Sequence, residues 1–195
     1  MGLGYSNPDP TFFNIKKTQY KMSCNAITLN NINAKCDKSI GGIKRIFVGD
    51  RSELEGLVVD STTGQVVYLS GITLKEWTFR KNTGSFTSTA TIDNTINSSY
   101  FTTEVGLQFS RAEAQKRLDI QSVINAGGVI VIIEDMYGEY LLLGKDKDVV
   151  ITSAVMQSGT NSTDLSGFQL TFTDTSIEMP HYINKDYVSV EALKG

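Results

Sequence analysis

The chain has 195 residues, of which 40% are hydrophobic and only 20% are charged. This length fits one domain of ordinary size with a hydrophobic core, and the abundance of threonine, serine, asparagine and glycine favours strands and turns over solvated helices. The formal net charge of −3 argues against a general nucleic-acid binder, which would carry a basic surface. No apolar run reaches the ~18 residues of a membrane-spanning helix, so no membrane span is predicted.

Residues 1–40 are predicted to form an extended N-terminal arm. The segment Asn7-Pro8-Asp9-Pro10 excludes helix there, because each proline restricts its own backbone and that of the preceding residue. The arm also carries more aromatic side chains than a free linker needs, and we expect them to dock on a neighbouring subunit. The subunit-interface residues predicted in the arm are Phe12, Phe13 and Tyr20. Whether Cys24 and Cys36 pair is left open.

Residues 41–180 are predicted to form a β domain of eight to ten strands. Short apolar or alternating runs are separated by turn residues, as between Val59 and Gln65, where Ser61-Thr62-Thr63-Gly64 predicts a hairpin. The run Val129–Ile133 is apolar throughout, which predicts a central strand covered on both faces. The other predicted strands are Ile43–Val48, Leu57–Asp60, Gln65–Leu69, Thr73–Arg80, Ser85–Ile92, Phe101–Phe109, Tyr140–Leu143, Val149–Met156 and Phe168–Thr173.

Strict alternation in Ser85–Ile92 predicts a strand with two different faces. Phe86, Ala90 and Ile92 point to one side. The small hydroxyl residues on the other side suit a wetted, uncharged wall, and they are predicted to face a channel. These lumen-facing residues are Ser85, Thr87, Thr89 and Thr91.

One helix is predicted, over residues 111–126. Ser110 and Glu113 have the spacing of a capping box, in which the serine accepts from the third helical amide and the glutamate bonds the cap amide. Gly127-Gly128 provides a left-handed position that ends the helix. Together with the strands, this helix predicts an antiparallel β-sandwich or partly closed barrel flanked by one α-helix.

No catalytic, cofactor-binding or metal-binding site is predicted, and the chain is expected not to be an enzyme. The only histidine, His181, follows a proline in the tail and is expected at a surface or interface. The pairs Glu134-Asp135 and Asp146/Asp148 are interpreted as turn carboxylates. The stretch Gly138–Lys145 has five residues between its glycines and a strand-like interior, which excludes a phosphate-binding loop.

Residues 181–195 are predicted to form a C-terminal tail. Tyr182 and Tyr187 are the tail residues that we predict at the subunit interface.

The order of these segments resembles tail-tube-like virion proteins from phages of Bacteroides-type bacteria, which include the ring proteins of short-tailed crAss-like phages. The resemblance is carried by four stretches in roughly the C-terminal 60% of the chain and leaves the first 40 residues without a counterpart. The stretches that carry it are Trp77-Thr78-Phe79, Arg111–Gly128, Val129–Asp148 and Thr152–Thr173.

This resemblance implies a structural component of a phage tail, assembled in the bacterial host cytoplasm. The expected partners are copies of the chain itself, in a ring of six or twelve, and other tail or portal-vertex proteins. DNA would pass through the channel without specific binding. The alternative is a binding module of a virion: a capsid decoration, fibre-base or carbohydrate-binding β-domain.

Overall fold

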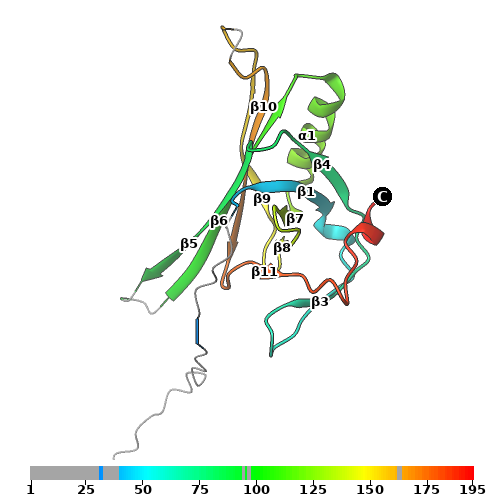
Figure 1. Cartoon of the computed structure of the whole chain (residues 1–195), viewed down its shortest axis with the longest axis vertical. Helices are drawn as coiled ribbons and strands as arrows, with labels where there is room; N and C mark the ends of the chain where they lie inside the picture. The colour runs from blue at the N-terminus through cyan, green and yellow to red at the C-terminus, as the bar shows by residue number, and fades with distance from the viewer. Residues whose placement is uncertain (1–30, 33–39, 94, 96–97, 162–163) are drawn as a thin grey trace, which may run out of the picture. The chain divides into compact units, whose positions relative to one another are not determined.

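The structure is a computed structural model that describes residues 31–32, 40–93, 95, 98–161 and 164–195. From residue 39 onward the chain is one compact unit built mainly of β-strands, with a single α-helix among the described residues. The two main sheets are antiparallel and pack face to face without closing into a barrel (Figure 1). The predicted mainly β fold with one flanking helix is therefore confirmed, in its sandwich form.

A five-stranded sheet has the order β11–β8–β7–β1–β4. Its central strand β7 is apolar over residues 129–133, and all five of these side chains are buried. The strands are β1 (Ile43–Asp50), β4 (Lys75–Thr78), β7 (Val129–Asp135), β8 (Tyr140–Leu143) and β11 (His181–Tyr182).

A four-stranded sheet has the order β5–β6–β10–β9. The β5–β6 hairpin is longer than the rest of the sheet, and its distal half extends beyond the body of the domain (Figure 1). The strands are β5 (Gly84–Asp93), β6 (Ser98–Ser110), β9 (Val150–Gln157) and β10 (Gly167–Ser176).

The main core lies between these two sheets. Phe172 and Leu170 of β10 and Ile133 of β7 are fully buried there. Trp77 meets Phe109 edge-on, with ring centroids 5.7 Å apart. The alternation of apolar and polar residues along the strands accounts for this core, because every second side chain of a strand points to the same face of the sheet.

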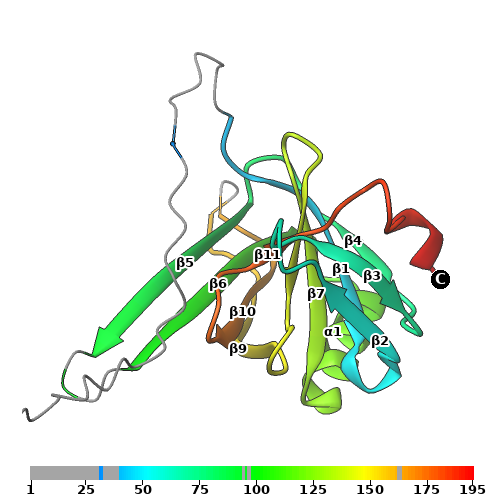
Figure 2. The same ribbon diagram turned by 90° about the horizontal axis from the view of Figure 1, so that it is seen from below.

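A second core covers the opposite face of the five-stranded sheet. Phe47 and Ile132 of that sheet pack there with a small hairpin and the C-terminal segment (Figure 2). The hairpin joins β2 (Gly56–Val59) to β3 (Val66–Ser70), and Gly64 takes a left-handed conformation in its turn. Two short 3-10 helices, η1 (Arg51–Glu53) and η2 (Glu191–Leu193), complete the fold. The predicted covering of Val129–Ile133 on both faces is thus confirmed.

The helix begins later than the sequence predicts. Helix α1 spans Ala114–Ala126, its N-cap is Glu113, and no side chain bonds the cap. Ser110 is instead the last residue of β6, opposite Gly167 of β10. The predicted capping box is therefore wrong, because strand pairing holds the serine in the sheet. The predicted end is confirmed, since Gly127 adopts a left-handed conformation with φ of 77°.

Candidate assembly surface

The outer face of the four-stranded sheet carries mostly small, uncharged side chains, and its larger exposed hydrophobic residues are Tyr100, Val150 and Val155. Ser85, Thr87, Thr89 and Thr91 are all exposed on this face, as their register with β6 requires. Central strand β10 adds threonines at the positions opposite β6 residues of the same face. Among the described residues of the four strands, the charged side chains on this face are Glu104 and Asp93. The face is therefore wetted, nearly neutral and slightly acidic.

Both edges of this sheet are long and nearly free of charge. β9 has eight residues with no charged residue or proline, and β5 has ten residues with Asp93 at its end as the one charge. Soluble proteins usually protect such edges with lysine, proline or very short strands. The edges of the five-stranded sheet are shorter, because β11 has two residues and β4 has four, including Lys75 and Glu76.

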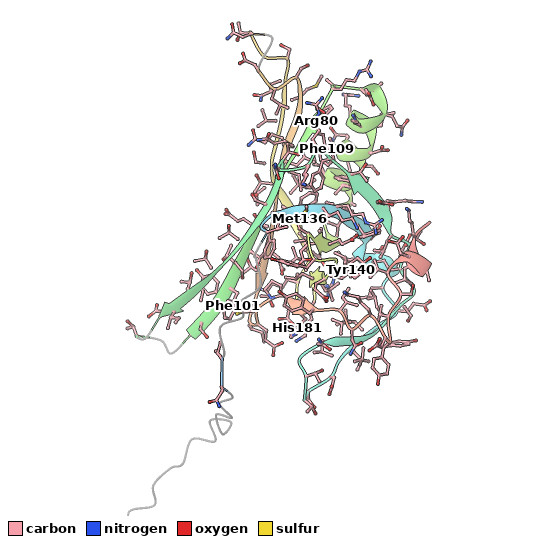
Figure 3. The ribbon with its side chains drawn as sticks, viewed as in Figure 1. Arg80, Phe101, Phe109, Met136, Tyr140 and His181 are labelled. Atoms are coloured by element: carbon pink, nitrogen blue, oxygen red, sulfur yellow. The ribbon has the colours of Figure 1, made fainter. Side chains whose placement is uncertain are left out.

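The inner side of these edge strands exposes apolar groups. Ile92 of β5 is 68% exposed, and Met156 of β9 is 62% exposed. Ala90 and Ala154 are exposed on the same side. Phe101 lies at the protruding end of β6 and Phe109 at its core end (Figure 3). The distal hairpin therefore has an apolar side without a layer of its own domain above it.

The predicted interface residues of the tail are exposed, with Tyr182 at 46% and Tyr187 at 73%. Their neighbours Ile183 and Val188 pack into the second core of the same chain. The segment is thereby held against the five-stranded sheet, and Tyr182 pairs with Leu141 of β8. The arm residues Phe12, Phe13 and Tyr20, and Cys24 with Cys36, lie outside the described residues.

His181 connects the C-terminal segment to two loops. Its Nε2 lies 2.9 Å from Glu178 and 3.3 Å from the Lys145 ammonium, and its Nδ1 lies 2.8 Å from the carbonyl oxygen of Gly64. The carbonyl accepts the Nδ1 proton, so Nε2 faces the two charged groups. Lys145 and His181 together lower the pKa of Glu178. These contacts join β11 to the β2–β3 turn and to the loop after β8.

The carboxylates interpreted as turn residues have different surroundings. Asp135 does serve the turn, because its side chain accepts from the amides of Tyr137 and Glu139. Glu134, in contrast, is a buried member of β7 that bonds both Lys44 and Arg45. A bulge between Ile43 and Arg45 allows two successive basic residues to reach one carboxylate. Sequence reasoning missed this cluster, since a bulge leaves no trace in period-two patterning.

Ion pairs shift the pKa values of the groups in this cluster. Burial raises the pKa of Glu134, but hydrogen bonds from Lys44 and Arg45 outweigh burial and hold it below its usual range. For Arg45, burial alone would lower the pKa, but Glu134 and Glu76 raise it. Both groups therefore stay charged, and the cluster links β1, β7 and β4. Its chemistry is structural.

A groove that the sequence does not reveal runs between strand β4 and helix α1. It encloses about 930 Å³ and is lined on one side by Glu76, Trp77 and Thr78 and on the other by Asp119, Ser122 and Val123. Smaller hollows prolong it past Phe109 and Ile120 toward Arg80. Its lining combines apolar residues (Val48, Trp77 and Val123) with charged ones (Lys75, Glu76 and Asp119), a mixture that also occurs in peptide- and ligand-binding surfaces.

No group of three or more histidine, cysteine, aspartate or glutamate side chains among the described residues is placed to hold a metal ion. No helix in this part of the chain is long and apolar enough to cross a membrane.

Comparison with known protein families, with curated proteins and with solved structures found no match to this chain.

Proposed function

We propose that this chain is a structural component of a bacteriophage tail, which forms a homo-oligomeric ring or tube around the DNA channel. The observation that carries the proposal is the pair of long, nearly uncharged edges on one sheet, β5 and β9. Unpaired backbone groups on such edges favour pairing with another chain. When both edges belong to the same sheet, copies join head to tail, and a head-to-tail contact closes into a ring if the rotation allows.

Strand directions agree with this closure. The four strands alternate in direction, so β5 and β9 run opposite to each other. A rotation about an axis roughly along the strands preserves these directions. β9 of one copy would therefore meet β5 of the next as an antiparallel pair and continue the ladder.

Side-chain chemistry also matches across the proposed junction. On the inner side, Ala90 and Ile92 of β5 would adjoin Ala154 and Met156 of β9, all of which are exposed and apolar. On the outer side, the threonines of β5 would adjoin Ser153 and Gln157, with Val150 and Val155 as apolar neighbours. Joining the edges would thus bury apolar surface and leave a continuous hydroxyl-rich wall.

The wall has the electrostatics that a DNA channel requires. Its sparse charge is negative, through Glu104 and Asp93, and it would repel phosphates weakly instead of holding them. For the alternative of a sugar-binding module, Trp77 is a poor stacking platform, because its ring is partly buried against Phe109 and Phe172. The assembly function therefore accounts for more of the surface.

Light scattering after size exclusion, over a wide range of protein concentration, tests the proposal together with electron microscopy of the purified particles. The expected result is a closed ring, or a tube of stacked rings, with a central channel. A chain that stays monomeric at every concentration, and that touches no copy of itself in the virus particle, would refute it.

Disulfide trapping locates the junction. Cys24→Ser/Cys36→Ser provides a background without native thiols, to which Ala154→Cys is added with Ala90→Cys. Since antiparallel register is not fixed in advance, Ser88→Cys and Ile92→Cys replace Ala90→Cys in parallel samples. We expect oxidised ladders of linked copies for at least one register. The matched control pairs Ala154→Cys with Ala112→Cys, away from β5, and should give no ladder.

A further inference from the structure

The groove between β4 and α1 is an unfilled position for one more strand of the five-stranded sheet. β4 pairs with β1 on one side and ends the sheet on the other. At its start, the amide and carbonyl of Leu74 bond Leu193 and Gly195, and this parallel pairing comprises a single bridge, from Leu74 to Lys194. Beyond Leu74, the edge borders the groove.

The backbone of β4 presents hydrogen-bonding groups to this groove. Backbone groups along a strand point alternately to its two sides. Because those of Leu74 point away from β1, those of Glu76 and Thr78 do so too. Each residue brings one donor and one acceptor, so an added strand can bond both residues in full.

The side chains around the groove specify what the added strand must look like. Toward the sandwich interior, it would meet Trp77 and Val123, both half-buried, and Phe109. At the start of β4, Lys75 lies on the same side as Trp77, so the apolar stretch begins at Trp77. On the opposite face of the sheet, the added strand would meet Glu76, whose carboxylate forms ion pairs with Arg45 and Lys194. The occupant therefore needs alternation: apolar residues on one side, polar or cationic residues on the other, and no proline.

We propose that the occupant is the segment Phe13–Lys16 of a second copy, added as a strand to β4. In this segment Phe13 and Ile15 alternate with Asn14 and Lys16. The first two would pack against Trp77, Val123 and Phe109, and Lys16 would lie on the face of Glu76. This is peptide recognition by strand addition, in which backbone bonds give affinity and alternate side chains give specificity.

The described start of the domain points to a second copy as the source. Strand β1 has β7 on one side and β4 on the other. Just before β1, the amide of Ile40 donates to the hydroxyl of Tyr137 at 2.7 Å, in the turn after β7. The chain therefore enters β1 from the side opposite the groove. The 39 residues before Ile40 span up to ~130 Å when extended at about 3.3 Å each, which is ample to reach a neighbouring subunit.

This inference rests on the proposed function, and its test separates the two. A photo-crosslinking amino acid, p-benzoylphenylalanine, is placed at Ser122, on the α1 wall of the groove, in the full-length chain. Assemblies grown from equal parts of light and 15N-labelled protein are irradiated, digested and analysed by mass spectrometry. The matched control places the same group at Gln121, one residue along the helix and outside the groove lining.

We expect cross-linked peptides that join Ser122 to residues 11–17, including mixed light–heavy pairs, because the two peptides come from different copies. Phe13→Ser/Ile15→Ser should lower their yield by about tenfold or more, since two apolar anchors are lost. Asn14→Ser should leave the yield of the Ser122 cross-link unchanged. The probe at Gln121 should give no cross-link to residues 11–17.

Assembled particles with no cross-link, with a cross-link to another segment, or with only unmixed pairs would overturn the strand-addition proposal and leave the proposed function standing. A monomer at all concentrations would overturn both.

Discussion

Asp174 of β10 lies directly opposite Thr103 of β6 on the inner side of the four-stranded sheet, and both side chains are buried. Thr103 donates to the Ser88 hydroxyl at 2.9 Å. For Asp174, one carboxylate oxygen has no hydrogen-bond partner among the described residues. Burial raises the pKa of Asp174, the Gly144 amide lowers it less, and the nearby Asp146 raises it further.

Asp174→Asn is expected to stabilise the protein at neutral pH by about 1 kcal/mol, because it removes a buried charge and keeps an acceptor for the Gly144 amide. A carboxyl with a raised folded-state pKa contributes stability below its unfolded pKa and loses it as pH rises through the folded pKa. The advantage of the variant should therefore vanish near pH 3. Thermal unfolding of both proteins between acidic and neutral pH measures this, and an equal difference at every pH would contradict it.

Glu134→Gln is expected to destabilise the protein by about 2 kcal/mol at neutral pH, because Lys44 and Arg45 lose a buried counter-charge. The pKa of Glu134 is lowered overall, so its contribution is present above the ordinary glutamate pKa and is lost as pH falls through the folded value. Urea unfolding at neutral and acidic pH measures both effects.

The matched control for this variant is Glu139→Gln. Glu139 pairs with Lys185 at 2.6 Å, but both side chains are more than 40% exposed. Water screens such a pair, and the expected change is within about 0.5 kcal/mol. Equal losses in the two variants would show that burial of Glu134 is not what makes its ion pairs stabilising.

Local pattern predicted the strands well, since burial of one face imposes a period of two that is readable in Ser85–Ile92 and Phe101–Phe109. The run Val129–Ile133 has no alternation because both of its faces are covered. The start of the helix was not predictable from local sequence. Ser110 has the spacing of a helix cap, but in the fold it pairs with Gly167 of the distant strand β10.

The assembly surface was predictable only in part. Alternation places Thr87 and Thr89 on one face without any knowledge of neighbours. The open edges and the groove depend on strand order, in which β10 inserts between β6 and β9 through a connection that no short-range signal encodes. That β9 and β5 end the same sheet therefore emerged from the structure alone.

Ala154→Lys is expected to block assembly while the subunit stays folded. A lysine on an edge strand disfavours pairing with another chain, because the junction would desolvate its charge against apolar neighbours. Ala154 is exposed, so the folded subunit accommodates the change. Light scattering should report a monomer with an unfolding temperature near that of the parent. Gln115→Lys, on the exposed surface of α1, should assemble normally. Rings formed by the Ala154 variant would place the junction elsewhere.

Thr87→Lys/Thr89→Lys tests whether the hydroxyl-rich face lines the channel. Both residues are exposed and point to the wetted outer face, not to the apolar inner side of the junction where Ala154 lies, so their charges stay in water and assembly should persist. In a ring, every copy would add two positive charges to the wall, and double-stranded DNA of a length that threads the channel should bind with an affinity that falls steeply with salt. The parent, with its sparse acidic wall, should show no such binding.

Thr87→Ser/Thr89→Ser keeps the face neutral and serves as the control. In electron micrographs, DNA should occupy the channels of the lysine variant. DNA bound only around the outside of its rings would place this face on the exterior of the assembly.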